Sequence, residues 1–288
     1  MKGIGGFYYV YGEDGSLYEC RAKGKFRNIR VRPAPGDDVE FTPPTDTLGG
    51  SIDFICDRKN ELQRPFVVNI DQLAIVISVM DPAPDFTLVD KMMIYGQDLG
   101  VPVVLVLNKI DLRSDFSSIA DDYRKSGVSI VAVSSVTGEG MQELKEHLRG
   151  RITCFSGQSA VGKSTLLNAI GIDLNVETGE LSAKTRRGRH TTRHTELFRI
   201  EELDAYIMDT PGFSSLESLE IEPEDLGEFY PEFRQYIGRC RFDRCVHINE
   251  PDCEVKNNVL TGEIPEGRYE RYKYIYKELL ERRNNRYV

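Results

Sequence analysis

The feature that most restricts the fold of this chain is a G-x-x-x-x-G-K-S motif at residues 157–164. An apolar run, residues 151–155, precedes the motif, and a segment with helical character, residues 164–170, follows it and stops at Gly171. This is the strand–loop–helix context of a phosphate-binding loop, or P-loop, in which backbone N–H groups surround the phosphates and the helix N-terminus adds positive potential. A chance glycine–lysine turn is the alternative, and the flanking patterns disfavour it. The motif predicts an α/β sheet with a nucleoside triphosphate site.

The motif also predicts a role for individual side chains. Lys163 is expected to reach the β- and γ-phosphates, and the hydroxyl of Ser164 is expected to bind Mg²⁺. The residues predicted to contact the nucleotide in this loop are Gly157, Gln158, Ser159, Ala160, Val161, Gly162, Lys163, Ser164 and Thr165.

A second motif, Asn108, Lys109, Ile110 and Asp111, directly follows the apolar run at residues 101–107. A carboxylate at Asp111 can accept hydrogen bonds from the N1–H and the exocyclic amine of guanine, whereas adenine offers no such pair of donors. Asn108 is expected to tie this loop to the P-loop or to contact the base, and the stem of Lys109 to cover the purine. The motif is weak alone, but beside a P-loop it predicts guanine nucleotides.

Three more loops follow strand-like runs or lie between them. Ser134 and Ser135 follow residues 129–133 and suit a loop whose backbone N–H contacts the guanine O6. Asp209 and Gly212 follow residues 205–208 as Asp-Thr-Pro-Gly, which suits a water-mediated Mg²⁺ contact by Asp209 and a γ-phosphate contact by the Gly212 N–H. The segment Gly-Arg-His-Thr-Thr at residues 188–192 offers a threonine, Thr192 or Thr191, to complete the Mg²⁺ shell.

Phe213 stands directly after Gly212, where Ras-like GTPases place a glutamine that orients the attacking water. A phenylalanine cannot orient water, so slow unassisted hydrolysis is expected. The residue that we nominate as catalytic in place of the glutamine is His190, beside the predicted Mg²⁺ ligand Thr192.

The order of the motifs is unusual, because Asn108 precedes Gly157 by 49 residues. In a Ras-like GTPase the P-loop comes first and the Asn-Lys-x-Asp motif comes later. A circular permutation of the same sheet explains the order. The alternative, that Asn-Lys-x-Asp belongs to another domain, does not explain why the order within each half is intact.

Residues 1–66 have the pattern of a small β structure. Strand-like runs at residues 8–11, 17–27, 28–32, 38–41 and 51–56 are divided by glycine and proline turns, which suits a closed barrel of the OB type. In a strand over residues 17–27, four cations would share one face. These candidate RNA contacts are Arg21, Lys23, Lys25 and Arg27; the alternative is an ordinary solvated face.

Four metal-ligating residues lie close together near the C-terminus: Cys240, Cys245, His247 and Cys253. Three thiolates and an imidazole complete a tetrahedral Zn²⁺ shell, so a structural zinc site is predicted. Buried thiols with a surface histidine are the alternative. The remaining cysteines, Cys20, Cys56 and Cys154, are scattered and expected to be inert. Residues 268–286 then form a basic, tyrosine-rich helical stretch, which suits either stacking on unpaired RNA bases or packing against the zinc site.

The overall composition limits where a nucleic acid could bind. The net charge of −9 argues against a uniform nucleic-acid surface, so any RNA contact must be local. No apolar run approaches the about 20 residues that span a bilayer, and residues 1–10 lack the pattern of a signal peptide. We therefore expect a cytoplasmic protein without a membrane partner. A monomer is also expected.

With these motifs the chain resembles the bacterial ribosome small subunit-dependent GTPase A family. The resemblance extends over nearly the whole chain and includes Arg58-Lys59-Asn60-Glu61-Leu62 before Arg64-Pro65, the segment at residues 188–192, and the spacing Cys-x₄-Cys-x-His-x₅-Cys. It implies a GTPase that converts GTP to GDP and phosphate, acts late in 30S subunit maturation, binds 16S rRNA and is stimulated by the 30S subunit. The resemblance also points to the loop that contains His190 as the place of the catalytic residue.

The predicted architecture has three parts. An all-β OB-fold RNA-binding domain at residues 1–68 precedes an α/β circularly permuted P-loop GTPase domain at residues 69–219. A small zinc-binding, mostly helical domain with a basic helix follows at residues 220–288. The cofactors implied are one structural Zn²⁺ and the Mg²⁺ that accompanies GTP.

Two other classes of function are alternatives to this one. One is a nucleotide-regulated RNA- or ribosome-binding module in which hydrolysis is incidental, and Phe213 is the feature that favours it. The other is a zinc hydrolase or an ATP-dependent nucleic-acid enzyme. That class leaves Asn108 and Asp111 unexplained, and a catalytic zinc would need an open coordination position.

Overall fold

The computed structural model describes residues 3–4, 6–28, 31–63, 66–112, 115–172, 196–209 and 219–285. The chain forms two compact units, each built from segments that are distant in the sequence. Unit 1 comprises Met1–Ala74, Met141–Ser156 and Lys163–Phe213, and unit 2 comprises Ile75–Gly140, Gly157–Gly162 and Ser214–Val288.

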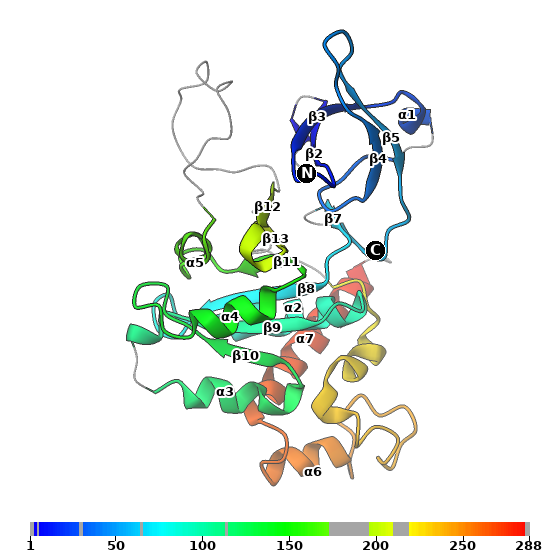
Figure 1. Cartoon of the computed structure of the whole chain (residues 1–288). Coiled ribbons are helices and arrows are strands. Elements are labelled where there is room, and N and C mark those ends of the chain that lie inside the picture. Colours follow the sequence, from blue (N-terminus) through cyan, green and yellow to red (C-terminus); the bar gives the residue numbers. More distant parts are fainter. Residues whose placement is uncertain are drawn as a thin grey trace. The chain divides into compact units, whose positions relative to one another are not determined.

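Unit 1 begins with a five-stranded sheet that curls into a barrel (Figure 1). Its strands follow the order β1-β2-β3-β5-β4, with β3 parallel to β5 and the other pairs antiparallel. Val10, Cys20, Phe26 and Ile52 form its buried core. The bounds of the strands are β1 Gly3–Ile4, β2 Phe7–Tyr11, β3 Leu17–Ala22, β4 Val39–Thr42 and β5 Gly50–Ile55. The predicted all-β barrel of the OB type is confirmed.

One predicted strand of the barrel is wrong in its length, and another is not found among the described residues of its run. Strand β3 ends at Ala22, and helix α1 occupies Lys25–Asn28, so Arg21, Lys23, Lys25 and Arg27 do not share one strand face. The chain turns at Lys23, whose N–H bonds to the carbonyl oxygen of Ile52, and the N–H of Phe26 bonds back to the carbonyl oxygen of Lys23 as in a helical turn. The run predicted as a strand at residues 28–32 contains none in its described part.

A short two-stranded ribbon, β6 (Glu61–Gln63) with β7 (Phe66–Val68), follows the barrel. Two asparagines stabilise it. Asn60 exchanges two hydrogen bonds with the backbone of Ile70, and the Asn69 side chain binds the carbonyl oxygen of Gly36 and the N–H of Lys59. The ribbon was not predicted as a separate element.

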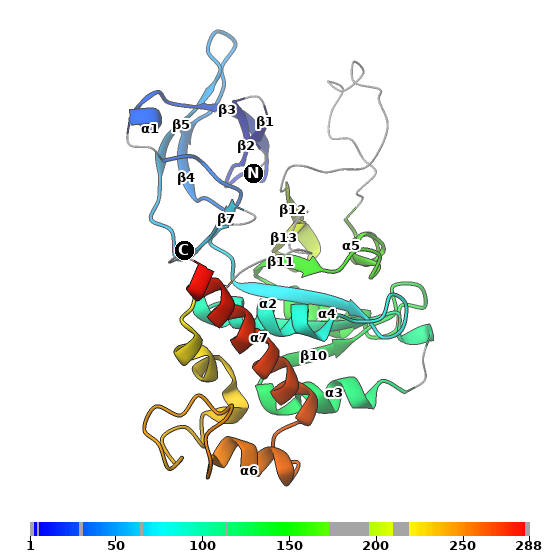
Figure 2. The same ribbon diagram turned by 180° about the vertical axis from the view of Figure 1, so that it is seen from behind.

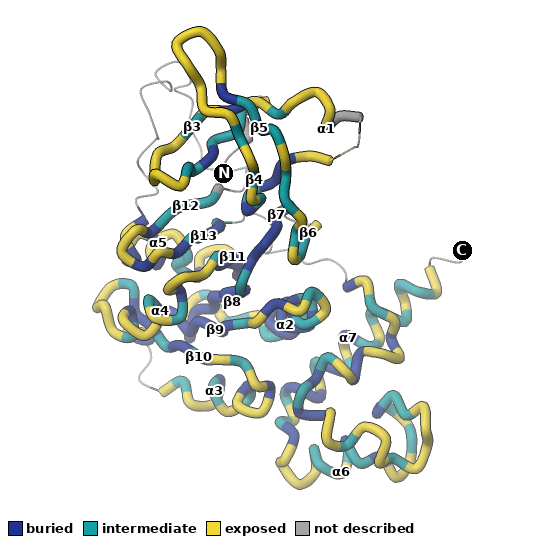
Figure 3. Tube along the Cα trace, turned by 45° about the vertical axis from the view of Figure 1, so that its right-hand side comes forward, coloured by how far each residue is buried: buried dark blue, intermediate teal, exposed yellow. Residues whose placement is uncertain are grey.

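The second sheet has six strands in the order β10-β9-β8-β11-β13-β12. The pairs β10–β9 and β11–β13 are parallel, and the edge pair β12–β13 is antiparallel. Every residue of β8 is buried, as expected for a strand covered on both faces (Figure 3). The bounds are β8 Gln72–Ser78, β9 Val103–Asn108, β10 Ser129–Ala132, β11 Ile152–Gly157, β12 Glu196–Ile200 and β13 Ala205–Asp209. The runs predicted at residues 101–107, 129–133, 151–155 and 205–208 are confirmed as the strands β9, β10, β11 and β13, whereas β12 was not predicted.

Helices connect these strands, as in an α/β fold. They are α2 (Phe86–Asp98), α3 (Ser117–Tyr123), α4 (Met141–Leu148) and α5 (Lys163–Ile170), with short 3₁₀ turns η1 (Ile110–Leu112), η2 (Arg124–Ser126) and η3 (Glu201–Leu203). The helix predicted at residues 164–170 is confirmed by α5. No helix in the described ranges is long and apolar enough to cross a bilayer.

The C-terminal part of unit 2 is built from the turns η5 (Pro223–Phe229) and η6 (Pro231–Phe233) and the helices α6 (Glu254–Leu260) and α7 (Glu266–Asn285). Helix α7 runs beside α2 (Figure 2). Tyr230, Phe233, Tyr269 and Tyr272 are buried together, and the rings of Phe233 and Tyr272 are 5.0 Å apart between centroids. Of the two interpretations of the tyrosine-rich helix, the structure favours packing for these residues.

Candidate nucleotide site and metal cluster

In unit 2, the Asn-Lys-x-Asp segment lies against the second half of the P-loop. Asn108, the last residue of β9, is buried, and its Nδ2 donates a hydrogen bond of 2.9 Å to the carbonyl oxygen of Val161. The Nζ of Lys109 donates to the carbonyl oxygens of Ala160 (2.8 Å) and Asp81 (2.6 Å). Segments far apart in the sequence are thus joined by three side-chain hydrogen bonds, and Asn108 ties the loops together, which is the first of the two roles expected for it.

Asp111 is exposed on η1, and its carboxylate is oriented by a neighbouring loop. The hydroxyl of buried Ser134 donates a hydrogen bond of 2.5 Å to Asp111 Oδ1. The same hydroxyl oxygen accepts the N–H of Thr137 at 3.0 Å, so its position is fixed by the loop that follows β10. Ile110 is buried beneath Asp111 and its N–H binds the carbonyl oxygen of Val133. Ser135 is half-buried in the same loop.

Close packing and a positive φ both require glycine at positions 157 and 162. At Gly162, φ is +88° and an added Cβ would lie 2.6 Å from Asn108 Nδ2. At Gly157, φ is +150° and an added Cβ would lie 2.1 Å from the carbonyl oxygen of Val76. Any larger residue at Gly162 would push Asn108 away from Val161, so the P-loop and the guanine motif depend on each other.

Two residues near this site were missed by the sequence analysis. The Oε1 of Gln158 accepts the backbone N–H of Asp85 at 2.9 Å, and the carbonyl oxygen of Asp81 holds Lys109. Asp85 is also the N-cap of α2, because its side chain accepts the N–H of Leu88. An aspartate directly before an apolar helical pattern is a recognised N-cap signal, which would have found Asp85. No sequence signal identifies the carbonyl of Asp81.

In unit 1, Lys163 lies close to the aspartate that ends β13. The Nζ of Lys163, at the start of α5, is 3.5 Å from Asp209 Oδ1, and Oδ1 has no hydrogen-bond partner among the described residues. Pairing of β13 with β11 places Asp209 opposite Phe155. Ser164 and Thr165 are exposed in the first turn of α5, whereas Ser159 and Ala160 are exposed in the loop before it.

The remaining predicted residues of the nucleotide site lie outside the described part of the chain. They are His190, Thr191, Thr192, Gly212 and Phe213.

The four residues of the Cys/His cluster come together in unit 2. Their ligand atoms all lie within 4.8 Å of one another: Cys240, Cys245, His247 and Cys253. Cys240 Sγ is 3.9 Å from Cys253 Sγ, and His247 Nδ1 is 3.6 and 3.3 Å from those two sulfurs. Metal–ligand bonds of about 2.3 Å to sulfur and about 2.0 Å to nitrogen in a tetrahedron place ligand atoms about 3.5–3.8 Å apart. The donor set therefore fits one metal ion, with Nδ1 as the histidine ligand.

Two tyrosines of α7 support the loop that carries His247. The hydroxyl of Tyr269 donates to the carbonyl oxygen of His247, and that of Tyr272 donates to the carbonyl oxygen of Val246, both at 2.7 Å. The carboxylate of Glu250 accepts backbone N–H groups from the same loop, which include that of Val246. His247 has a φ of +59°, so the loop holds it in a conformation that is uncommon outside glycine.

Burial sets the protonation of the cluster. It raises the pKa of the Cys245 thiol to about 12 and raises that of Cys253, while it lowers the pKa of His247. Buried thiols without a cation are thus neutral at pH 7, and a metal ion would release their protons because thiolates are the ligating form. Four protein donors leave no open position, so such an ion would be structural rather than catalytic.

We predict that Tyr269→Phe weakens metal binding about 10- to 100-fold, because it removes the hydrogen bond that positions the His247 carbonyl while it keeps the ring in the core. Competition with a chromophoric chelator measures the change. Tyr274→Phe is the matched control, since Tyr274 is on the same helix and is 60% exposed. Equal metal affinity of the two variants would contradict a supporting role for Tyr269.

Comparison with known proteins identifies the family. Residues 55–219 match a family model described as RsgA GTPase, and residues 1–50 match one described as RsgA N-terminal domain. A protein of Ruminiclostridium cellulolyticum named small ribosomal subunit biogenesis GTPase RsgA is 45% identical over 97% of this chain and 92% of its own length. One of the same name from Agathobacter rectalis is 43% identical over 98% of this chain and 97% of its own length.

Two solved structures share the fold. YjeQ from Thermotoga maritima superposes with a TM-score of 0.80 at 36% identity, and the match covers 95% of this chain and 94% of that one. YloQ, described as a circularly permuted GTPase, superposes with a TM-score of 0.78 at 33% identity over 98% of this chain and 93% of its own. The predicted circular permutation is confirmed. The chain belongs to the RsgA family of circularly permuted GTPases.

Proposed function

We propose that this GTPase is a factor of small ribosomal subunit biogenesis. It acts as a monomer in the cytoplasm, binds the 30S subunit and 16S rRNA, and hydrolyses GTP to GDP and phosphate faster when bound to the subunit. The names of its relatives support the ribosomal role. The single observation that carries the nucleotide part is the hydrogen bond from Asn108 to Val161, because it joins the guanine motif to the phosphate loop.

Guanine binds where Asn108, Lys109, Ile110 and Asp111 meet the loop of Ser134 and Ser135. Asp111 accepts the N1–H and the exocyclic amine, and Ser134 holds that carboxylate in place. The stem of Lys109 covers the purine, since its ammonium group is fixed by the carbonyls of Asp81 and Ala160. A base without the donor pair would leave Asp111 unpaired, which is how such a site discriminates.

The phosphates bind along the P-loop. Backbone N–H groups of residues 157–162 surround them, Lys163 and Thr165 lie at the start of α5, and the N–H of Gly212 contacts the γ-phosphate. Ser164, Thr192 and Asp209 hold Mg²⁺, which neutralises charge on the phosphate oxygens. The Oδ1 of Asp209 supports this assignment, because it accepts no hydrogen bond among the described residues and faces the ammonium of Lys163 at 3.5 Å. His190 orients the attacking water in place of the glutamine that Phe213 replaces.

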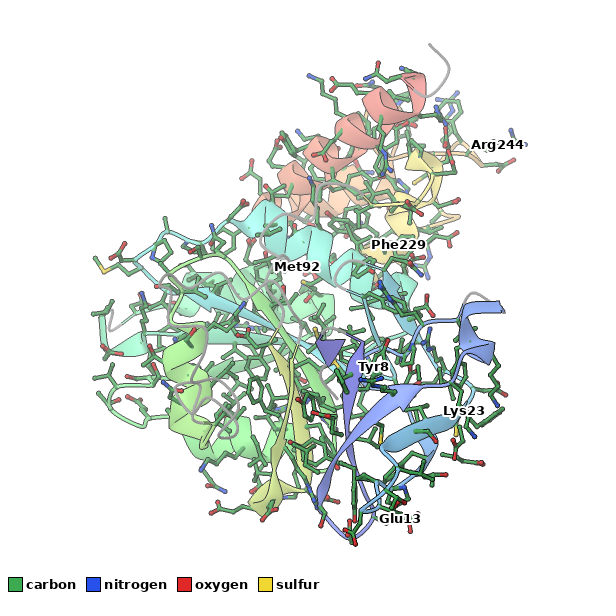
Figure 4. The ribbon with its side chains drawn as sticks, turned by 90° about the horizontal axis from the view of Figure 1, so that it is seen from above. Tyr8, Glu13, Lys23, Met92, Phe229 and Arg244 are labelled. Atoms are coloured by element: carbon green, nitrogen blue, oxygen red, sulfur yellow. The ribbon has the colours of Figure 1, made fainter. Side chains whose placement is uncertain are left out.

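The metal held by Cys240, Cys245, His247 and Cys253 is Zn²⁺, one per chain. The combination of three thiolates with an imidazole at tetrahedral spacings favours zinc over harder cations such as Mg²⁺, which prefer oxygen ligands. The ion fixes the shape of a loop that also presents exposed arginines, among them Arg244 (Figure 4).

RNA contacts by the barrel involve Arg21, Lys23, Lys25 and Arg27. Lys23 lies on the outer surface of the barrel, where its ammonium pairs with Asp53 at 2.8 Å (Figure 4). The guanidinium of Arg21 is 4.3 Å from the ring centroid of Phe7. To contact an RNA phosphate, Lys23 must give up or share its contact with Asp53, and Arg21 its contact with Phe7. Each therefore contributes less to RNA affinity than an unpaired cation would.

Guanine recognition is tested by Asp111→Asn. This variant should lose affinity for GTP and gain affinity for xanthosine triphosphate, because an amide donor replaces the carboxylate opposite the 2-position of the base. Equilibrium titration with both nucleotides measures the reversal. Asp98→Asn, an exposed carboxyl on α2, is the matched control. Unchanged GTP binding by Asp111→Asn would remove the motif from the site.

The ribosomal role is tested by measuring GTP turnover with 30S subunits, 50S subunits and naked rRNA. We expect slow basal turnover that only 30S subunits increase strongly, and Lys163→Ala should abolish turnover in all three cases. GTP-dependent binding to 30S subunits without faster turnover would favour the nucleotide-regulated binding module instead. No effect of any ribosomal component would contradict the proposal.

The identity of the metal is tested by elemental analysis of the freshly purified protein. About one zinc per chain is expected, and Cys245→Ser should lower it, because a neutral hydroxyl is a much poorer ligand than a thiolate. Cys56→Ser, a half-buried cysteine of unit 1, should leave the zinc content unchanged. The absence of zinc, or an equal content in both variants, would exclude this zinc site.

A further inference from the structure

The C-terminal segment of unit 2 binds helix α2 through a buried carboxylate. Asp90 on α2 is fully buried, and both of its oxygens are occupied. Arg268 of α7 forms an ion pair with Oδ1 at 2.6 Å, and Tyr123 donates to the same oxygen at 2.8 Å. Arg271 of α7 donates to Oδ2 at 2.7 Å. Two cations of α7 and a phenol of α3 thus fix one side chain of α2.

Arg268 is equally constrained on its other side. Its Nε donates to Glu232 Oε1 at 2.7 Å, and its guanidinium is 4.5 Å from the ring centroid of Tyr230. Burial alone lowers the pKa of Arg268, but the charges of Asp90 and Glu232 outweigh burial and raise it well above its usual value. A buried ion pair of this kind resists separation, because each charge would be left unpaired away from water.

Two further contacts join the same helices. The Nζ of Lys91, one residue after Asp90, binds both carboxylate oxygens of Glu278 on α7 at 2.7 Å. Ile94 of α2 is buried in the apolar cluster of the C-terminal segment. The middle of helix α2, from Asp90 to Ile94, is therefore held by residues of the C-terminal segment.

The N-terminal end of α2 leads directly to the guanine site. Its N-cap residue, Asp85, donates its backbone N–H to Gln158 of the P-loop, and the carbonyl of Asp81 accepts the Lys109 ammonium. The loop at residues 81–85 is thus anchored to α2 at one end and supports the P-loop and the guanine motif along its length. A displacement of α2 would move both supports.

We propose that Arg268 is a positioning residue for guanine-nucleotide binding, which acts through Asp90, helix α2 and the Asp81 carbonyl on Lys109. The inference rests on the proposed nucleotide site. Holding the supporting loop in its bound arrangement before the nucleotide arrives removes an ordering cost from binding. By thermodynamic reciprocity, bound nucleotide in turn stabilises the packing of α7 on α2.

The test uses the full-length, metal-loaded protein and Arg268→Lys. A lysine keeps the buried charge but cannot reach Asp90 and Glu232 with two separate nitrogens as the guanidinium does. We expect GDP to bind about fivefold or more weakly, measured by isothermal titration, with unchanged circular dichroism and metal content. Lys125→Met is the matched control: it breaks the Lys125–Glu263 ion pair, which also joins this segment to the rest of unit 2 but does not touch α2.

A double-mutant cycle separates positioning from a general loss of structure. In a Lys109→Met background, Arg268→Lys should cost little further affinity, because its effect passes through Lys109. The inference would be overturned if the losses in GDP affinity of the two single variants multiply in the double variant. It would also be overturned if Arg268→Lys folds and binds GDP as tightly as the wild type. If Arg268→Lys does not fold, Lys91→Met replaces it and must show the same non-additivity. Failure of the wild type itself to bind GDP would instead refute the proposed function.

Discussion

The hydrogen bond from Asn108 to the Val161 carbonyl is the interaction on which the proposed guanine site depends. It is buried, it joins the end of β9 to the P-loop, and it exists only because Gly162 leaves room for the asparagine amide. The ammonium of Lys109 adds a hydrogen bond to the carbonyl oxygen of Ala160 in the P-loop and another to that of Asp81. Loops that would otherwise be independent connections therefore act as one preorganised surface, and their separation in the sequence has no consequence for their proximity in space.

The permuted order of the motifs follows from the same principle. A sheet is defined by which strands pair, and the chain can enter it at β8 as well as at β11 without altering those pairs. The permutation does change which elements the ends of the chain contact. In unit 2, the C-terminal segment returns to helix α2, where Arg268 and Arg271 enclose Asp90. The end of the chain thereby becomes part of the support of a loop that contacts Lys109.

Sequence reasoning succeeded where one physical signal dominated. Apolar runs predicted the strands β9, β10, β11 and β13, most of whose residues are buried or half-buried. Motif chemistry gave the P-loop as one of two expected partners of Asn108. It failed where tertiary packing overrode a local pattern. The alternating cations from Arg21 to Arg27 suggest a strand, but Lys23 bonds to Ile52 and the chain turns there, so that the Phe26 N–H returns to the Lys23 carbonyl. Arg268 lies in a stretch for which RNA stacking and packing against the zinc site were both open, and its burial depends on Asp90 and Glu232, which are distant in the sequence.

The central claim is that the joined loops select guanine nucleotides. The most direct measurement is competition of unlabelled GTP and ATP for the wild-type protein loaded with a fluorescent GDP analogue, in the presence of Mg²⁺. The hydrogen bonds that Asp111 would make only with guanine predict that GTP displaces the probe at a concentration at least ~100-fold lower than ATP. Equal displacement by the two nucleotides would contradict the account.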